Sequence, residues 1–475
     1  MISFIQNKER TLLVMRALVM RAAIFALCAI TVVCNSFADV DLYVSTSGTD
    51  ENDGLSLETP KLTLESAIIA ATNGLANGVS TNYNINVADG PYTMTSSAGL
   101  IITNGVNIVG NVDPTKVIIS SQTAAGSRLV RMYGGSIYGV TLKGGVTTGA
   151  ENNRISHVYA CNGAQIENCI ITDTNLNGQG GYICNITGKN TKIKNTIIRN
   201  NVGYGTSAWL KSLAALFLND YAVAEGVVVS NISIRYYATN KTDHGAPICM
   251  GANTTLRSSL VCGNTRPPSY TYYTSVGVKI VGANALLEDC VIENNTAQLK
   301  NYNKQLGAGG LLICANNATI RRTAIRNNKV LAHSGADEPG GVHIYNKNAR
   351  FENCQISGNT CDYGATAGVK IESGANATFV NCSIYGNKKT LVEGLKAHGV
   401  YIYGSTTVGF YNSMIANNGP DAGWEGGLNI FHSATKPTFT NCLLSAAEIE
   451  TYGNETCITG DPLMRVNDDG DVDDA

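Results

Sequence analysis

Short runs of alternating apolar and polar residues recur along the chain at intervals of 27 to 35 residues. Each run contains one recurring position, which we call the slot. An apolar residue lies three positions before the slot, and another lies two positions after it. The slots are Val140, Cys169, Thr196, Asn231, Ser259, Cys290, Thr323, Cys354, Cys382, Ser413 and Cys442. Only Ser233 interrupts the second apolar column. The pattern predicts about eleven copies of a repeat built from short strands.

A second strand, introduced by Gly, lies 13 to 15 residues before the later slots, as in "GVHIY" from Gly341 and "GVKIE" from Gly368. Apolar and variable residues alternate in it, and a period of two places one face against a core and the other away from it. We expect Val342 and Ile344 to point inward. His343 and Tyr345 should then point outward.

The residue before most slots is Asn, between two inward-facing positions three apart. These residues are Asn168, Asn195, Asn353, Asn381, Asn412 and Asn441, with Asp289 in one copy. Strict alternation forbids that spacing, so we expect the chain to bend there, with Asn in the left-handed conformation and its amides stacked along the rod. Ser230, Ser258 and Arg322 replace Asn in three copies and predict weaker bends.

A repeat of this length with short strands and no helical periodicity excludes helical solenoids, and the absence of "W-D" signatures argues against a propeller. What remains is a coiled β-solenoid. With one turn per copy and a spacing of about 4.8 Å, eleven turns form a rod roughly 50 Å long. The amphipathic segment from Leu62 to Ala71 is expected as an N-terminal cap helix, followed by "INVADGPYT" as the first strand, and the last turn closes near Cys442 to Pro462.

The motif "I-x-x-N", for example Ile356 to Asn359, together with the Gly-led strands resembles right-handed parallel β-helix proteins of the pectin-lyase-like superfamily. The repeats are most similar to those of polymorphic outer-membrane proteins. The opening "DLYVSTSGTDENDG" and the late "ITGDPL" also resemble the ends of bacterial secreted β-helix proteins. The resemblance implies an all-β fold, a single right-handed parallel β-helix of about eleven turns over residues 39–464 with an N-terminal cap helix. It also implies a substrate groove on the sheet of the Gly-led strands.

Composition agrees with a β-rich fold, because 50 Gly and 22 Tyr accompany only 15% charged residues. A net charge of −2 without a dense Lys/Arg cluster disfavours nucleic acid as a partner.

Residues 1–38 are predicted to be a signal peptide, since Arg21 precedes the apolar run Ala22–Val33. We therefore expect an extracellular or cell-surface monomer without a membrane span in the mature chain. A retained anchor is the alternative.

Fourteen Cys in an exported chain invite disulfides, but the slot column mixes Cys with Thr and Ser. That behaviour favours buried thiols, with a bond between Cys354 and Cys382 left open. No Cys spacing fits a zinc site. We predict no metal site and no cofactor, and leave Ca²⁺ as an alternative. The acidic tail 465–475 resembles half of a Ca²⁺ loop, with Asn467, Asp469 and Asp471 as ligands. Arg465 occupies the first ligand position, so a frayed tail is the favoured interpretation.

Two outward columns of the Gly-led strands carry the candidate chemistry. The first contains Pro247, Lys279, Leu312, His343, Lys370, Tyr401 and Asn429, and the second contains Cys249, Val281, Cys314, Tyr345, Glu372, Tyr403 and Phe431. Stacking gathers six of these polar and aromatic side chains within about 10–15 Å. Aromatic faces beside polar groups suit a sugar ring. The structural alternative is that Tyr and Lys are simply suitable for exposed strands.

The leading hypothesis is a protein that binds a polysaccharide or a cell-surface glycan, with Tyr345, Glu372, Tyr403, Lys279 and Trp424 as contacts. The second hypothesis is a polysaccharide lyase. In it Lys370 is the base, either His343 or a bound ion lowers the pKa of Lys370, and Tyr401 is the acid. The carboxylate cluster that holds Ca²⁺ in many pectate lyases is missing. The third hypothesis is a structural rod without a ligand.

Overall fold

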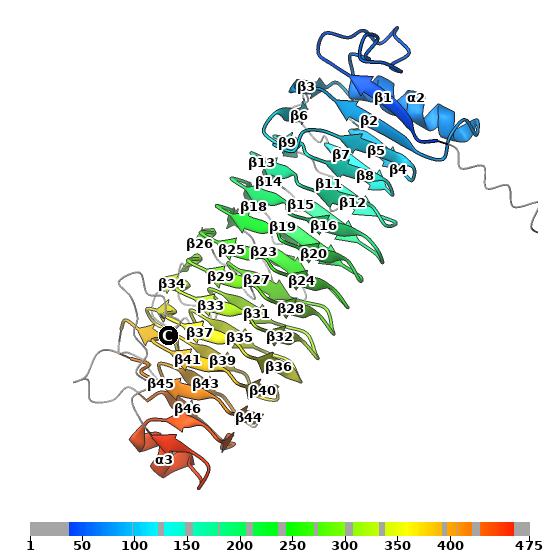
Figure 1. Ribbon diagram of the computed structural model, residues 1–475. Helices are drawn as coiled ribbons and strands as arrows, with labels where there is room; N and C mark the ends of the chain where they lie inside the picture. The colour runs from blue at the N-terminus through cyan, green and yellow to red at the C-terminus, as the bar shows by residue number, and fades with distance from the viewer. Residues whose placement is uncertain are drawn as a thin grey trace, which may run out of the picture.

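The structure is a computed structural model that describes residues 38–459 except for 97, 122–127, 148–154, 179–180, 206–211, 236–243, 270–273, 300–306, 332–337, 392–396, 405 and 420–427. The fold is a mostly β parallel solenoid with two short helices (Figure 1). The predicted signal peptide, except for its last residue, and the acidic tail lie outside the described residues. Within the described part, no helix is long and apolar enough to cross a membrane.

Each turn of the solenoid passes in order through four parallel sheets, which we name A, B, D and C. Sheet A contains β1 (Val40–Val44), β2 (Tyr83–Val87), β5 (Val106–Val109), β8 (Ser136–Tyr138), β12 (Gln165–Glu167), β16 (Lys192–Lys194), β20 (Val223–Glu225), β24 (Thr255–Arg257), β28 (Leu286–Glu288), β32 (Thr319–Arg321), β36 (Ala349–Glu352), β40 (Asn376–Val380), β44 (Thr407–Tyr411) and β47 (Thr438–Thr440). Sheet B contains β3 (Gly90–Met94), β6 (Val117–Ser121), β9 (Thr141–Lys143), β13 (Ile170–Thr172), β17 (Ile197–Arg199), β21 (Val228–Ser230), β25 (Leu260–Cys262), β29 (Val291–Glu293), β33 (Ala324–Arg326), β37 (Gln355–Ser357), β41 (Ser383–Tyr385), β45 (Met414–Ala416), β48 (Leu443–Leu444) and β49 (Ile458–Thr459).

The two remaining sheets complete the turn. Sheet D contains β10 (Val146–Thr147), β14 (Asn175–Gly178), β18 (Val202–Gly205), β22 (Ser233–Arg235), β26 (Thr265–Ser269), β30 (Thr296–Leu299), β34 (Lys329–Leu331), β38 (Thr360–Cys361) and β42 (Lys388–Lys389). Sheet C, formed by the Gly-led strands, contains β4 (Leu100–Thr103), β7 (Val130–Tyr133), β11 (Ile155–Cys161), β15 (Gly181–Thr187), β19 (Ser212–Asn219), β23 (His244–Met250), β27 (Val278–Ile280), β31 (Leu311–Ile313), β35 (Val342–Ile344), β39 (Val369–Ile371), β43 (Val400–Ile402) and β46 (Ile430–His432).

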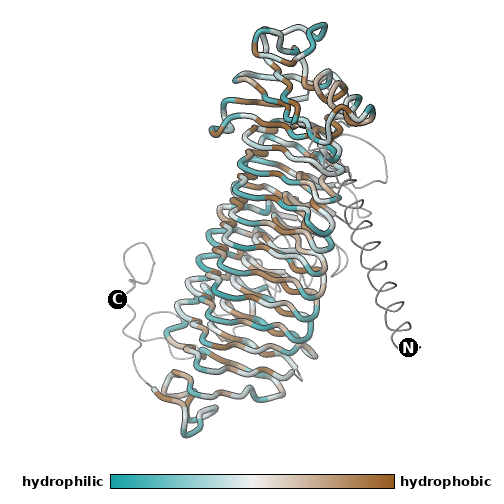
Figure 2. The backbone as a smooth tube through the Cα atoms, turned by 45° about the vertical axis from the view of Figure 1, so that its right-hand side comes forward, coloured by the Kyte–Doolittle hydropathy of each residue, from teal (hydrophilic) through white to brown (hydrophobic). Residues whose placement is uncertain are grey.

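The predicted repeat is confirmed. Its eleven copies correspond to β8 and the ten strands that follow it in sheet A, and three further strands of that sheet precede β8. Sheet D has nine strands among the described residues, so nine turns have a strand in all four sheets. Figure 2 shows hydrophobic and hydrophilic stretches alternating along each stacked turn.

One copy is placed four residues away from its predicted register. Ile193 pairs with Ala224 in sheet A, and Ile198 pairs with Val229 in sheet B. The slot is therefore Val227 and not Asn231, and the apparent interruption at Ser233 disappears. The run "VVVSNISI" offers apolar residues at the repeat spacing in two registers, and Gly226, with φ of 63°, takes the bend in the observed one.

The bends between sheets A and B have the predicted left-handed conformation, with φ of 52° at Asn168 and 53° at Asn353 and Asn381. The prediction of weaker bends at the exceptions is wrong. Ser258 and Arg322 have φ of 48° and 46°, and Ser230 lies in strand β21 instead of at a bend. Stacking over the whole turn imposes the same bend on whichever residue occupies it.

The slot column is buried, as predicted, and its short side chains close the bends. The Cys169 thiol donates to the Glu167 carbonyl oxygen at 3.2 Å, and the Thr196 hydroxyl donates to the Lys194 carbonyl oxygen at 2.7 Å. A thiol or hydroxyl can make this contact, which explains why Cys, Ser and Thr interchange. Cys354 and Cys382 on adjacent turns are both free thiols.

The "I-x-x-N" motif forms a buried amide ladder inside the turn between sheets B and D. Each Nδ2 donates to the Oδ1 of the next member at 2.9 or 3.0 Å. The members in that turn are Asn264, Asn295, Asn328, Asn359, Asn387 and Asn418, and Asn429, just before β46 of sheet C, extends the ladder. The ladder ends where Asn429 donates to Glu448 at 3.0 Å. Buried amides are costly unless paired, so the ladder holds neighbouring turns in register.

Both ends of the solenoid are covered by helices. The predicted N-terminal cap is α2 (Leu64–Ala76), which buries Leu64, Ala67, Ile68 and Ala71 and starts at the N-cap Thr63. At the other end the sequence analysis missed α3 (Ala446–Tyr452), which starts with a capping box between Ser445 and Glu448. The strand "INVADGPYT" is also not the first, because β1 precedes α2 and pairs with β2.

Candidate functional site

The two outward columns predicted for the Gly-led strands, which we call the strip, lie on sheet C and are stacked in register. His343 pairs with Lys370, and Lys370 pairs with Tyr401 on the next turn. Lys279 and Leu312 continue the same column on the preceding turns. The backbone N–H of Glu372 donates to Ile344 O, and that of Tyr403 donates to Ile371 O, which continues the second column.

At both ends of the strip the predicted register is shifted by two residues. Cys249 pairs with Lys279, so Cys249 belongs to the first column and Pro247 does not. Phe431 pairs with Tyr401, so Phe431 joins the first column while Asn429 belongs to the amide ladder. These copies have different distances between the Gly and the strand, which the alternation of residues alone does not reveal.

The main correction concerns exposure, because most of the strip is buried and does not form an open groove. The exposed fractions are 0% for Lys279 and His343, 2% for Lys370, 6% for Tyr401 and 9% for Tyr345. Among the polar and aromatic side chains of turns 343–403, Tyr403, at 48%, and the Glu372 side chain, at 16%, are the more exposed. Strands β27, β31, β35, β39 and β43 of sheet C are thus buried on both faces, as parallel strands commonly are.

Apolar neighbours along the same outer face were the available signal for this burial. Leu312, Cys314 and Tyr345 pack with Ala308 in one cluster. A second outer cluster contains Tyr182, Ala214, Phe217, Ala246 and Cys249. Alternation shows that two faces exist, but only the composition of the outward column shows which of them faces water.

A charged network lies at the centre of the strip. The Glu372 carboxylate oxygen Oε1 lies 2.8 Å from the Lys370 ammonium and 2.9 Å from His343 Nε2. The other ring nitrogen of His343, Nδ1, lies 2.8 Å from Gly307 O. The His343 and Tyr345 rings pack with their centroids 4.4 Å apart. Hydrogen bonds therefore fix Glu372 Oε1 and both ring nitrogens of His343.

Burial and these contacts set the protonation of the network. Burial raises the pKa of Glu372, but the His343 hydrogen bond and the Lys370 charge outweigh it and lower the pKa to about 2. For His343, burial lowers the pKa below its ordinary value, against the opposite effect of Glu372 and Gly307. We therefore take Glu372 as ionised and His343 as neutral at pH 7, with the ammonium of Lys370 as the partner of the carboxylate.

The C-terminal end of the strip is aromatic. The Tyr401 ring lies between Tyr403, at a centroid distance of 6.2 Å, and Phe431, at 5.7 Å. Tyr403 is the exposed ring of this group. The predicted contact Trp424 and most of the loops that lead into the Gly-led strands lie outside the described residues. Across the described ranges, no group of three or more His, Cys, Asp or Glu could hold a metal ion.

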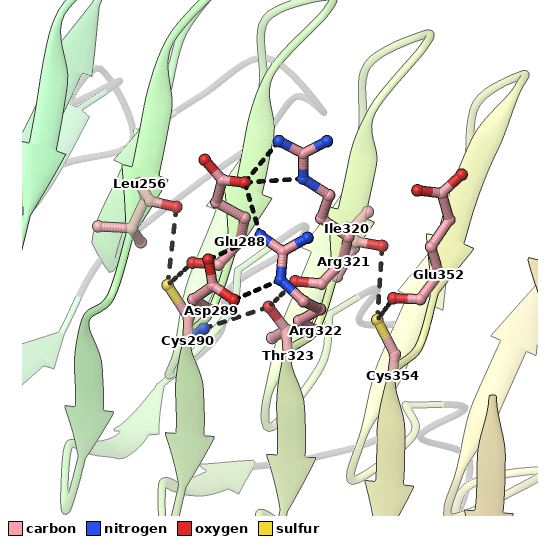
Figure 3. Close-up of polar contacts among 10 residues, drawn as sticks. All are labelled: Leu256, Glu288, Asp289, Cys290, Ile320, Arg321, Arg322, Thr323, Glu352 and Cys354. Carbon is pink, nitrogen blue, oxygen red and sulfur yellow. Dashed lines mark hydrogen bonds and ion pairs between the residues drawn. The ribbon is translucent and has the colours of Figure 1, made fainter. Parts of the chain in front are cut away.

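A second charged cluster, missed from the sequence, lies at the corner between sheets A and B (Figure 3). The Glu288 carboxylate lies 2.6 Å from Arg321 and 3.1 Å from Arg322. Arg322 also contacts Asp289 at 2.6 Å. These side chains come from two adjacent turns and neutralise each other. They stabilise the bend at Arg322, and the cluster leaves no unbalanced charge for a ligand.

Two surface grooves lie away from the strip. One, of about 400 Å³, follows the bends at the C-terminal end and is lined by Asn381, Asn412, Asn441 and their neighbours. The other, of about 440 Å³, lies at the N-terminal end and includes Asp41, Tyr43 and Asn86. Neither contains a residue predicted to contact a ligand or to act in catalysis.

A comparison with protein families agrees with the coiled architecture. A family model described as "Right handed beta helix region" matches residues 248–459. The A-module of the mannuronan C-5 epimerase AlgE6 from Azotobacter vinelandii is 13% identical, with 84% of this chain and 95% of that module covered and a TM-score of 0.47. A rhamnogalacturonan lyase is 11% identical, with 85% of this chain and 87% of that chain covered and a TM-score of 0.36. A mannuronic acid-specific polysaccharide family 6 lyase from human gut microbiota is 12% identical, with 84% of this chain and 90% of that chain covered and a TM-score of 0.37.

No curated protein matches the sequence significantly. At these identities and TM-scores, the likeness assigns no reaction and no ligand to this chain. None of these names is that of a polymorphic outer-membrane protein, so that part of the resemblance stays a prediction.

Proposed function

We propose that this chain is exported and binds a polysaccharide or a cell-surface glycan at the C-terminal end of the outer face of sheet C. The observation that supports this is an exposed aromatic ring, Tyr403, beside the partly exposed carboxylate of Glu372 on the adjacent turn. A sugar ring packs its C–H face on such a ring while its hydroxyl groups donate to such a carboxylate.

The buried part of the strip supports this surface by holding it rigid. Lys370 and His343 both contact Glu372 Oε1, which fixes that oxygen and leaves the other carboxylate oxygen for a ligand hydroxyl. Tyr401 packs against Tyr403 and fixes the position of its ring. A site held in this way loses little conformational entropy on binding. Direct contact with Lys279, Tyr345, Lys370 and Tyr401 is not part of the proposal, because these side chains are buried.

The lyase hypothesis, with Lys370 as base, stays a prediction that this geometry does not favour. Lys370 is 2% exposed and its ammonium lies 2.8 Å from the Glu372 carboxylate, so it is paired and out of reach of a polymer. We therefore rank binding above elimination. Incubation with uronate polymers distinguishes the two hypotheses, because elimination forms an unsaturated product that absorbs ultraviolet light.

The binding proposal is tested by co-sedimentation with a panel of neutral and uronate polysaccharides. Tyr403→Ala should lower the affinity at least tenfold, which corresponds to a loss of about 1.4 kcal/mol. Tyr411→Ala is the matched control, because Tyr411 is an exposed tyrosine, 40% accessible, on the next sheet. Absence of binding to every glycan, or equal binding by both variants, would contradict the proposal and favour a structural rod.

Export is tested separately. The chain recovered from outside the producing cells should begin near Asp39, as N-terminal sequencing would show. Retention of the intact leader in that fraction would instead indicate an anchor.

A further inference from the structure

The groove at the N-terminal end of sheet A lies at the opposite end of the solenoid from Tyr403. It passes over β1, β2 and β5, where Tyr43 pairs with Asn86 and Asn86 pairs with Val109. Leu57 and Pro60, from the segment 45–61, form its other wall. Its volume of about 440 Å³ lies within the range of roughly 300–1,000 Å³ that is typical of small-molecule sites.

The segment 45–61 is firmly attached to the edge of sheet A. Tyr43 N donates to Gly54 O at 2.8 Å, and Lys61 N donates to Tyr43 O at 2.9 Å. The buried Lys61 ammonium donates to Asn52 O at 2.7 Å and to Asp50 O at 3.3 Å, so the segment is closed around its own cation. These bonds protect the edge strand β1 and hold the wall of the groove in place.

Two side chains that line the groove, Asp41 and Asn86, present oxygen acceptors. The side-chain amides of Asn84 and Asn86 both donate to Asp41 Oδ1, at 3.4 and 3.2 Å, which occupies these donors. Oδ2 of Asp41 and Oδ1 of Asn86 then accept no hydrogen bond from any described residue, and Tyr43 adds a hydroxyl that can donate or accept. No Lys or Arg among the described residues forms an ion pair with Asp41. The carboxylate is therefore not compensated.

These features define the chemistry of a ligand. Several acceptors beside an uncompensated carboxylate attract hydroxyl donors and repel anions. The Tyr43 ring, Pro60 and Leu57, whose side chain is 75% exposed, provide apolar surface for the C–H face of a ring. We propose that this groove is a second ligand site, which takes an uncharged sugar unit and rejects uronates.

Titration calorimetry with neutral disaccharides built from glucose, galactose or mannose tests this inference, alongside oligouronates and a lysine-rich peptide. We expect binding of at least one neutral disaccharide, and weaker or absent binding of the oligouronates and the peptide. Tyr43→Ala should lower the affinity about tenfold. Asp41→Asn, which removes the charge, should allow the oligouronates to bind.

Two controls separate this site from the fold and from the site at Tyr403. Leu57→Ser changes a residue that is 75% exposed, so it should weaken binding several-fold without affecting stability, even if Tyr43→Ala fails to fold. Tyr411→Ala, on the same face of sheet A near its other end, should bind neutral disaccharides as the wild type does. Loss of binding in Tyr403→Ala alone would place the sugar on sheet C and overturn the inference.

Absence of binding to every neutral disaccharide, unchanged affinity in Leu57→Ser, or preference for the oligouronates or the peptide would likewise overturn it.

Discussion

The molecule holds two clusters of opposite charges that differ in their exposure to water. In the network on sheet C, Lys370 contacts Glu372 at 2.8 Å and is 2% exposed. At the corner between sheets A and B, Arg322 contacts Asp289 at 2.6 Å, and the side chains are 48% and 42% exposed. The distances are similar, but the same contact has different consequences. In water it is worth little, whereas in the interior the loss of one partner is costly.

The difference also teaches how a repeat is interpreted. In both clusters, stacking places residues at equivalent repeat positions on adjacent turns side by side. The sequence pattern therefore identifies neighbours equally well in the two clusters. It does not identify which neighbours are covered, and the function of a side chain depends on that.

The largest expected effect comes from removing the mostly buried carboxylate of Glu372. Glu372→Ala removes the partner of Lys370 and the Nε2 contact of His343, and it should lower the free energy of unfolding by about 3–5 kcal/mol. Urea denaturation followed by circular dichroism measures this change. A loss below about 1 kcal/mol would show that the network is solvated.

A buried neutral contact should rank next. Asn359→Ala removes hydrogen bonds to Asn328, Asn387 and Ile325 O in the amide ladder, and we expect a loss of about 2–3 kcal/mol. The same denaturation experiment applies. The matched control is Asn381→Ala, whose exposed amide contacts only Asn353 among the described residues, and which should lose less.

Acid should reveal the buried network through its pH dependence. The pKa of Glu372, about 2 in the folded state, lies below its ordinary 4.5, so its contribution is complete above pH 4.5 and is lost as the pH falls towards 2. The lowered pKa of His343 has the same sign, because its contribution is complete above pH 6.5 and is lost on acidification. Glu372→Ala should therefore lose less stability than the wild type between pH 4.5 and 2. Parallel curves for the two proteins would argue against this assignment.

The exposed cluster should show the smallest effect. Asp289→Asn removes one ion pair with Arg322, and we expect a change below about 1 kcal/mol, which decreases further in high salt. Thermal unfolding at two salt concentrations measures it. A loss as large as that of Glu372→Ala would remove the distinction between the clusters.

The inward side of the fold was predictable because several signals agree there. Ile356, Cys354 and Asn359 each recur at fixed spacing, so the strands, the bends and the thiol column follow from the sequence. The predicted register was wrong at two kinds of place. Near Val228 the apolar residues fit the repeat in two registers, and near Phe431 the distance between the Gly and the strand differs from that in other copies.

The candidate site was predictable in part. The neighbours His343, Lys370 and Tyr401 were identified, whereas their burial was not, because it depends on how the outer face is covered. Leu312 and Cys314 in the same columns indicated that face. The groove at Tyr43 was missed, since it depends on the fold of the segment 45–61 and does not recur in the repeat.

Lysine-reactive footprinting of the folded protein tests the burial of the strip most directly. We expect the exposed Lys347 to be modified rapidly. Lys370 and Lys279, which are buried, should stay unmodified until the protein is unfolded. Modification of Lys370 at the rate of Lys347 would contradict the account, because the strip would then be an open groove.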